Sequence, residues 1–177
     1  MGFGIDEKVA FVPVGIAVLT VSDTRDEATD KSGAVLVELA KAAGHDVVRK
    51  AIVPDSKARI EAQLTEWIRD PKIEVVISTG GTGVTGRDVT PEVFEQFYDK
   101  PIPGFGELFR WLSYADIGTS TIQSRATAGV ASGTFLFALP GSTGACRDAW
   151  EKILKYQLDI RHKPCNFVEL LPRLHEK

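Results

Sequence analysis

The stretch that decides the fold runs from residue 73 to residue 92 and reads IEVVISTGGTGVTGRDVTPE. Its first six residues, Ile73–Ser78, are mostly apolar and β-branched, which is typical of a buried strand. Its last three predict a helix start: Thr90 as the capping residue, Pro91 in the first turn and Glu92 near the positive end of the helix dipole. A glycine-rich loop therefore joins a strand to a helix, which indicates an α/β protein.

This loop consists of alternating threonines and glycines, namely Thr79, Gly80, Gly81, Thr82 and Gly83. Ligands of open α/β sheets bind where strands end, and glycines let the backbone approach an anion closely. We expect Gly81 at the closest approach to the ligand and Asp88 as a metal-binding carboxylate. The loop thus predicts a phosphate site. A plain turn is the alternative, because the loop lacks the lysine of a P-loop and the G-x-G-x-x-G of a dinucleotide fold.

The rest of the chain continues the alternation of strands and helices. Apolar runs and turn residues predict strands over 14–21, 47–53, 73–78, 126–130 and 134–139, with helices over 32–43, 56–69, 91–98, 108–114 and 143–158. Residues 101–106 are expected to form a turn, and Trp111 to pack inward. This order predicts a three-layer α/β/α sandwich whose sheet is mostly parallel with one antiparallel edge strand. We expect one domain over 1–177, with its core at about 14–158 and an extension at each end.

Composition narrows the class of protein. The 177 residues are 44% hydrophobic and 25% charged, and the formal net charge of −3 argues against a nucleic-acid-binding protein. No apolar run is long enough to span a membrane, and the first residues lack the pattern of a signal peptide. The two cysteines, Cys146 and Cys165, form no ligand cluster, so free thiols in a reducing cytoplasm are expected. His45, after a helix-ending glycine, is expected at the surface.

Polar residues follow four predicted strands, and in a parallel sheet these ends share one edge. They are Ser22 and Asp23, then Asp55, then the glycine loop, then Pro140, Gly141 and Ser142. Carboxylates held close together are unfavourable unless a cation lies between them, and Mg²⁺ prefers one or two carboxylates plus phosphate oxygens. Arg87 and Arg125, the latter preceded by Ser124, are candidate phosphate contacts because a guanidinium matches phosphate geometry.

Five motifs occur in an order that matches a known family: Thr79–Gly83, Arg87–Glu92, Pro103–Glu107, Ser124-Arg125 and Leu139–Ser142. With them the chain resembles, from about residue 14 to residue 167, the molybdenum cofactor biosynthesis family of MoaB and MogA, the molybdopterin adenylyltransferases. Residues 117–121 and 164–167 look particularly like MoaB. The resemblance implies a MogA-like fold that binds molybdopterin, transfers AMP from Mg-ATP to its terminal phosphate and releases pyrophosphate.

The resemblance also assigns roles to residues. It implies that Asp55 and Asp88 are the catalytic, Mg²⁺-binding aspartates and that Glu107 and Ser142 help to line the pterin pocket. It implies trimers or hexamers, cytoplasmic location and other molybdenum cofactor biosynthesis proteins as partners. We expect apolar residues of the termini, Phe3, Phe11 and the run 167–171, to pack on neighbouring subunits.

Three other functions remain as alternatives. The first is a molybdopterin-binding or scaffold protein of the same fold without catalysis. The second is a nucleotide-hydrolysing relative of the competence-damage family, which has consecutive acidic residues where this chain has Arg87-Asp88. The third is a dinucleotide-binding dehydrogenase, disfavoured because the first strand ends in Ser22-Asp23-Thr24 without glycines.

Overall fold

The structure, a computed structural model, describes residues 4–176. Its main sheet has the strand order β3-β2-β4-β7-β6-β5. The strands are β2 (Gly15–Val21), β3 (Asp46–Val53), β4 (Val75–Thr79), β5 (Lys100–Pro101), β6 (Thr127–Ala131) and β7 (Thr134–Leu139). The first three and β7 are parallel, and β6 is antiparallel to β7. The predicted sheet is confirmed. It has one further strand that was not predicted, the two-residue β5, which pairs antiparallel with β6 at the edge of the sheet.

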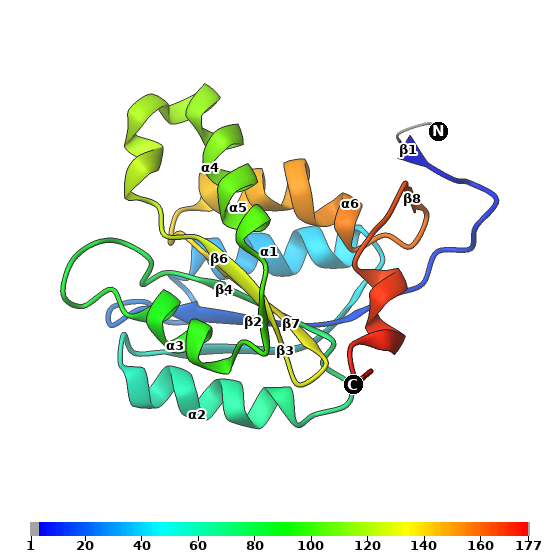
Figure 1. Cartoon of the computed structure of the whole chain (residues 1–177). Coiled ribbons are helices and arrows are strands. Elements are labelled where there is room, and N and C mark those ends of the chain that lie inside the picture. The colour runs from blue at the N-terminus through cyan, green and yellow to red at the C-terminus, as the bar shows by residue number, and fades with distance from the viewer. Residues whose placement is uncertain (1–3, 177) are drawn as a thin grey trace.

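Helices cover both faces of this sheet (Figure 1). One face carries α1 (Lys31–Ala42), α4 (Pro103–Ile117), α5 (Thr143–Ala149) and α6 (Lys155–Gln157), the last two joined by a π-helical segment, Trp150–Leu154. The other face carries α2 (Lys57–Ile68) and α3 (Thr90–Phe97). Two shorter 3₁₀ segments are η1 (Gly118–Gln123) and η3 (Val168–Arg173). The predicted three-layer sandwich is therefore present.

Strand β2 shows why the pattern of apolar residues forces this architecture. Ile16 and Val18 pack into the core under α1, while Ala17 and Leu19 pack into the core over α2. Because helices cover both faces, every residue of β2 is buried, and the strand is continuously apolar rather than alternating.

Helix α4 differs from the sequence-based expectation. It begins at Pro103, inside the expected turn, because proline suits the first helical position. A Cβ on Gly106 would lie 2.4 Å from the carbonyl oxygen of Ala126, so this glycine lets α4 pack closely on the start of β6. Trp111 does not pack inward: it is 73% exposed.

The terminal extensions pack on their own chain rather than standing free. Strand β1 (Gly4–Ile5) pairs with β8 (His162–Lys163), and the ring of Phe167 lies 4.7 Å from that of Phe135. Phe11 contacts His45, which is buried, contrary to expectation, and whose Nδ1 accepts a hydrogen bond from the Val14 amide at 3.2 Å. Phe11 and Phe167 thus have packing partners in their own chain, and Phe3 lies outside the described residues. Packing of these residues on neighbouring subunits stays a prediction.

Two negative findings apply to residues 4–176. Both cysteines are free, Cys146 buried and Cys165 exposed. None of the described helices combines the length and the apolar character needed to cross a membrane.

Candidate functional site

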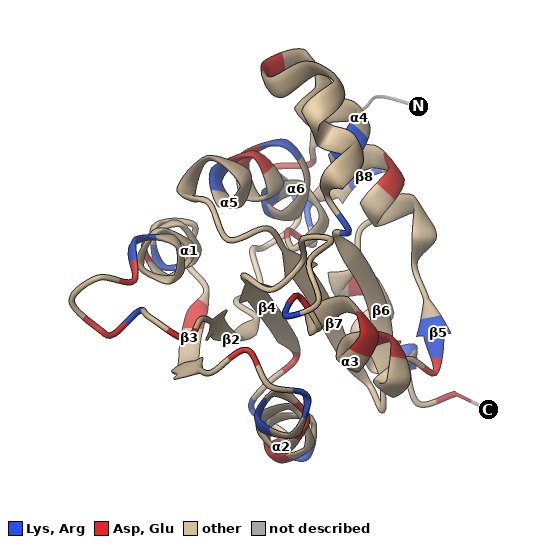
Figure 2. Ribbon diagram, turned by 90° about the vertical axis from the view of Figure 1, so that its left-hand side faces the viewer, with Lys and Arg blue, Asp and Glu red and all other residues tan. Residues whose placement is uncertain are grey.

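The parallel strands bring the predicted polar residues to one edge of the sheet, which Figure 2 views face on. Acidic and basic segments lie side by side in the loops at this edge. Because β6 runs antiparallel to β7, it starts where the others end, and Ser124 and Arg125 arrive at the same edge. The predicted convergence of the strand ends is therefore present in the structure.

The glycine loop needs its glycines because it packs tightly against protein atoms. Gly80 and Gly81 have φ angles of 104° and 64°, a backbone region that other residues rarely adopt. A Cβ on Gly80 would lie 2.2 Å from the Val21 carbonyl oxygen, and a Cβ on Gly81 2.3 Å from the hydroxyl of Thr90 and 3.0 Å from Oδ1 of Asp55. Gly81 thus faces Thr90 and Asp55, and a side chain there would press on these groups before reaching a ligand.

Asp55 has one carboxylate oxygen without a hydrogen-bond partner, although the backbone amide of Val89 bonds to the carboxylate. Its Oδ1 and the hydroxyl of Thr90 are both buried, and neither has a hydrogen-bond partner among residues 4–176. Burial, followed by the nearby charge of Asp88, raises the pKa of Asp55, and Asp23 adds to the effect. Buried polar atoms in native proteins are nearly always paired, so these two oxygens are candidates to bind a ligand or a metal ion.

Thr90 is not the capping residue of α3 that the sequence predicts. Val89 is the N-cap of α3, and no side chain caps this helix. Thr90 is instead the first helical residue, with its amide donating to the carbonyl of Gly81 at 3.0 Å. The threonine ties the helix start to the glycine loop, and its hydroxyl packs against Gly81.

Asp88 has the opposite environment to Asp55. Its Oδ2 accepts hydrogen bonds from the hydroxyl and the amide of Thr85, the latter at 2.9 Å. The Thr85 side chain is the largest of the effects that lower the pKa of Asp88. Beside the same loop, Asp88 thus has a hydrogen-bonded carboxylate with a lowered pKa, whereas Asp55 has an unpaired Oδ1 and a raised pKa.

Arg87 and Asp23 connect the loops at this edge. Arg87 forms an ion pair with Oδ2 of Asp23, and Oδ1 of Asp23 accepts the Asp55 amide at 3.1 Å. Arg87 is largely exposed, so this ion pair is readily exchanged for another anion. Ser22, by contrast, has a local role: its hydroxyl accepts the amides of Thr24 and Arg25.

Arg125 holds the glycine loop in place through hydrogen bonds from its guanidinium to backbone carbonyls. Its Nε donates to the Gly83 carbonyl and its Nη2 to the Asp88 carbonyl, both at 2.7 Å, while Nη1 pairs with Glu92. Its own amide donates to Thr82 at 3.3 Å. The guanidinium therefore fixes the segment that carries Asp88.

A cavity of about 590 Å³ opens beside the loop. Among the predicted site residues, its walls include Gly81, Thr82, Gly83, Asp88, Ser124, Pro140, Gly141 and Ser142. The catalytic candidate Asp55 adjoins it behind Gly81, and Thr79 and Gly80 lie in the strand end beneath it. This volume lies in the range of small-molecule sites.

Glu107 does not line this cavity. It borders a separate one of about 810 Å³ between α4, α3 and β6, together with Arg110 and Arg125. The reason is that α4 begins earlier than expected, which turns Glu107 toward the outer strands of the sheet. Ser124 borders both cavities.

The cavity wall that faces the glycine loop was not predicted from the sequence. It is formed by α4, η1 and α5, through Phe109, Ser113, Asp116, Ile117, Ser120, Thr121, Gln123, Gly144, Ala145 and Asp148. Residues 117–121 were noticed only as part of the family pattern. The polar positions of α4 inside an apolar helix, such as the buried Ser113, are the signal that was available.

Within residues 4–176, no group of three or more histidine, cysteine or acidic side chains is arranged to hold a metal ion alone. The donors present suit a different kind of site. Mg²⁺ is usually bound by one or two carboxylates together with substrate phosphates, and Asp55 and Asp88 supply that number. The unpaired Oδ1 of Asp55 agrees with a metal that arrives with its substrate.

Comparison with known proteins gives the same family from sequence and from structure. A family model described as a probable molybdopterin binding domain matches residues 17–160. The chain is 54% identical over 157 residues to molybdenum cofactor biosynthesis protein B of Escherichia coli K12, covering 89% of this chain and 92% of that protein. It is 47% identical over 149 residues to the Staphylococcus aureus Mu50 protein of the same name, covering 82% and 88%.

Solved structures agree with this assignment. A crystal structure of molybdenum cofactor biosynthesis protein B superposes with a TM-score of 0.86 at 40% identity, covering 96% of this chain and all of that one. The tungsten cofactor synthesizing protein MoaB of Pyrococcus furiosus gives 0.77 at 34% identity, with 93% and 98% covered. With these relatives and the site's arrangement at the sheet edge, the chain belongs to the MoaB family of molybdenum cofactor biosynthesis proteins.

Proposed function

We propose that the protein binds molybdopterin in the cavity beside the glycine loop and transfers AMP from Mg-ATP to its terminal phosphate. The observation that carries this proposal is Asp55, whose buried Oδ1 lacks a partner and whose pKa is raised beside a second carboxylate. Perturbed carboxylates in a cleft are typical of functional sites. The family membership supports molybdopterin as the ligand.

In this reaction an oxygen of the molybdopterin phosphate forms a bond to the α-phosphorus of ATP, and the bond to the β-phosphate oxygen breaks. The attacking phosphate is already an anion, so no residue has to remove a proton from it. Asp55 and Asp88 would hold Mg²⁺, which neutralises charge on the triphosphate when bound. The amides of Gly81 and Thr82 and the hydroxyl of Thr82 would orient the phosphates, and Arg125 keeps that segment in place.

The test is pyrophosphate release from Mg-ATP in the presence of molybdopterin. Asp55→Asn and Asp88→Asn should each lower turnover by about a hundred-fold or more, the usual loss when a positioned catalytic group is removed. Asp70→Asn is the matched control, because Asp70 follows α2 at the opposite edge of the sheet and should leave turnover unchanged. Wild-type turnover in both site variants would refute the proposal.

The second candidate function is molybdopterin binding without catalysis. It shares the cavity but gives no role to the unpaired Asp55. Calorimetric binding of molybdopterin without any release of pyrophosphate by the wild-type protein would favour it over adenylyl transfer.

We also propose that the protein forms homo-oligomers through α4 and η1. Apolar side chains are spaced along this segment and remain exposed: Leu108, Trp111, Tyr114, Ile117 and Ile122. A contiguous apolar surface of this kind on a water-exposed helix usually marks an interface. A trimer or a pair of trimers would cover it, and the termini would not be required.

A further inference from the structure

Three successive carbonyl groups of the loop after β7 are each held by a donor from another segment. The Leu139 oxygen accepts the amide of Gly80 at 3.0 Å, and the Pro140 oxygen accepts the hydroxyl of Thr79 at 3.0 Å. The Gly141 oxygen accepts Nη2 of Arg25 at 2.9 Å. The first two donors belong to the glycine loop, whereas Arg25 comes from the loop after β2 and has no role so far.

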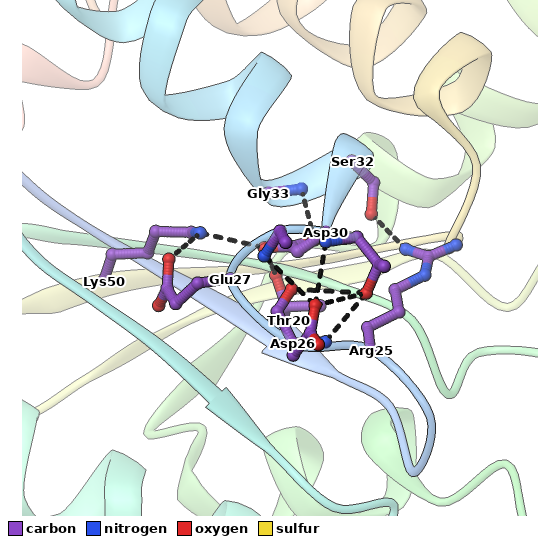
Figure 3. A network of polar contacts seen from close by, with 10 residues as sticks. Thr20, Arg25, Asp26, Glu27, Asp30, Ser32, Gly33 and Lys50 are labelled. Atoms are coloured by element: carbon purple, nitrogen blue, oxygen red, sulfur yellow. Dashed lines mark hydrogen bonds and ion pairs between the residues drawn. The ribbon is translucent and has the colours of Figure 1, made fainter.

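Arg25 is anchored both at its backbone and at its guanidinium. Its amide donates to the hydroxyl of Ser22 at 3.2 Å, and its Nη1 donates to the hydroxyl of Ser32 in the first turn of α1 (Figure 3). A guanidinium is a rigid plane, so contacts from two of its nitrogens fix its orientation. Arg25 therefore links α1 to the loop 140–142.

This link bears on the cavity although Arg25 is absent from its walls. A trans peptide is planar, so the carbonyl of Gly141 and the amide of Ser142 point in opposite directions. When Arg25 fixes the carbonyl, it also fixes the direction of that amide. Gly141 and Ser142 both line the cavity, and a glycine would otherwise let this part of the wall turn freely.

We propose that Arg25 is a positioning residue for molybdopterin: it holds the Gly141–Ser142 wall of the cavity in its binding geometry without touching the ligand. The inference rests on the proposed function, because it names molybdopterin as the ligand whose binding the wall serves. It predicts an effect on molybdopterin affinity and none on the bond-breaking step.

The test compares Arg25→Met with Lys50→Met. Lys50 belongs to the same polar network, where its Nζ lies 2.9 Å from Glu27 and 3.2 Å from the buried Asp30 that caps α1 (Figure 3). Its ion pairs do not reach residues 139–142. Because Lys50→Met leaves a buried carboxylate without its cation, it should lower the melting temperature at least as much as Arg25→Met does.

Two measurements separate positioning from stability. Amide hydrogen exchange should speed up about tenfold or more at residues 141–145 in Arg25→Met and remain unchanged there in Lys50→Met. The KM for molybdopterin should rise about tenfold in Arg25→Met, with kcat and the KM for ATP within about twofold, as expected for loss of one charge-assisted hydrogen bond. Arg25→Lys keeps the charge but not the rigid pair of Nη donors, so it should also raise the KM for molybdopterin, by less than Arg25→Met does.

Each outcome decides the proposal. Unchanged exchange at 141–145 in Arg25→Met overturns it, as does faster exchange without a rise in KM, or an equal rise in KM in Lys50→Met. If the wild-type protein neither binds molybdopterin nor turns over, adenylyl transfer fails by itself. The inference that Arg25 positions a molybdopterin site then fails with it, and the exchange data show separately whether Arg25 orders the loop.

Discussion

Substituting Gly81 with alanine tests the packing of the glycine loop most directly. The added Cβ would lie 2.3 Å from the Thr90 hydroxyl, closer than any stable contact, and 3.0 Å from Oδ1 of Asp55. In addition, the φ angle of 64° is one that alanine adopts only with strain. Both effects act on the folded protein without any ligand.

The size of the loss follows from these two terms. A left-handed backbone conformation costs a residue with a side chain about 1–2 kcal/mol. Forcing an extra carbon into a packed site costs about 1–3 kcal/mol. Together they predict that Gly81→Ala lowers the free energy of unfolding by about 2–5 kcal/mol, a large part of the 5–15 kcal/mol typical of a domain.

The assay is urea unfolding followed by tryptophan fluorescence, since Trp67 and Trp150 are buried. Gly86→Ala is the control in the same loop, because a Cβ there would meet no atom within 4 Å and its φ is not positive. A second control is the double variant with Thr90→Ala, which removes the closest contact and should recover the packing term but not the backbone term. A loss for Gly81→Ala no larger than that for Gly86→Ala would refute the reasoning.

Two further predictions concern pH and assembly. Burial lowers the pKa of His45 below its ordinary value of 6.5, so the unfolded chain binds more protons and the free energy of unfolding should fall as pH drops below about 6.5. His45→Gln, whose amide oxygen can still accept the Val14 amide, should lack this part of the pH dependence in urea titrations at pH 5 to 8; an identical profile would contradict the assignment. Ile122→Asp, at an 81% exposed position, should shift the protein toward monomers in light scattering without lowering its melting temperature. A wild-type monomer at micromolar concentration would contradict the proposed interface.

Most of the fold could be predicted because its signals are local. Strand β2 is apolar throughout since it is covered on both faces, and the residues after each parallel strand necessarily meet at one edge. The start of α4 was missed because Pro103 and Gly104 are also turn signals, and the packing of Gly106 on Ala126, which favours a helix there, is not visible in the sequence. His45 was misplaced for a related reason: Phe11 and Trp150, which bury it, are far away in sequence.

The candidate site was predictable only in part. Asp55 and Asp88 could be named because their residue type and their place after predicted strands are visible in the sequence. That Arg125 binds backbone carbonyls of residues 83 and 88, rather than offering a free guanidinium, depends on how β6 enters the sheet. No sequence pattern reports which arginine is already engaged, and the same limit hid Arg25.

Asp55 and Asp88 should differ in their effect on the free energy of unfolding, and this difference gives a second test of the role of Asp55. The pKa of Asp55 is raised, so the folded state binds this proton more tightly than the unfolded chain does. The free energy of unfolding therefore falls as the pH rises from the ordinary pKa of an aspartate through the raised pKa of Asp55, and it stays lower at neutral pH. Asp55→Asn should therefore leave the melting temperature at pH 7 equal or higher, while it removes the rise in melting temperature that Mg-ATP gives the wild-type protein. Asp88→Asn should lower the melting temperature, because it weakens the hydrogen bonds from Thr85. A fall in melting temperature for Asp55→Asn in the absence of ligand would mean that the carboxylate stabilises the fold, and its unpaired oxygen would then carry no argument for a substrate.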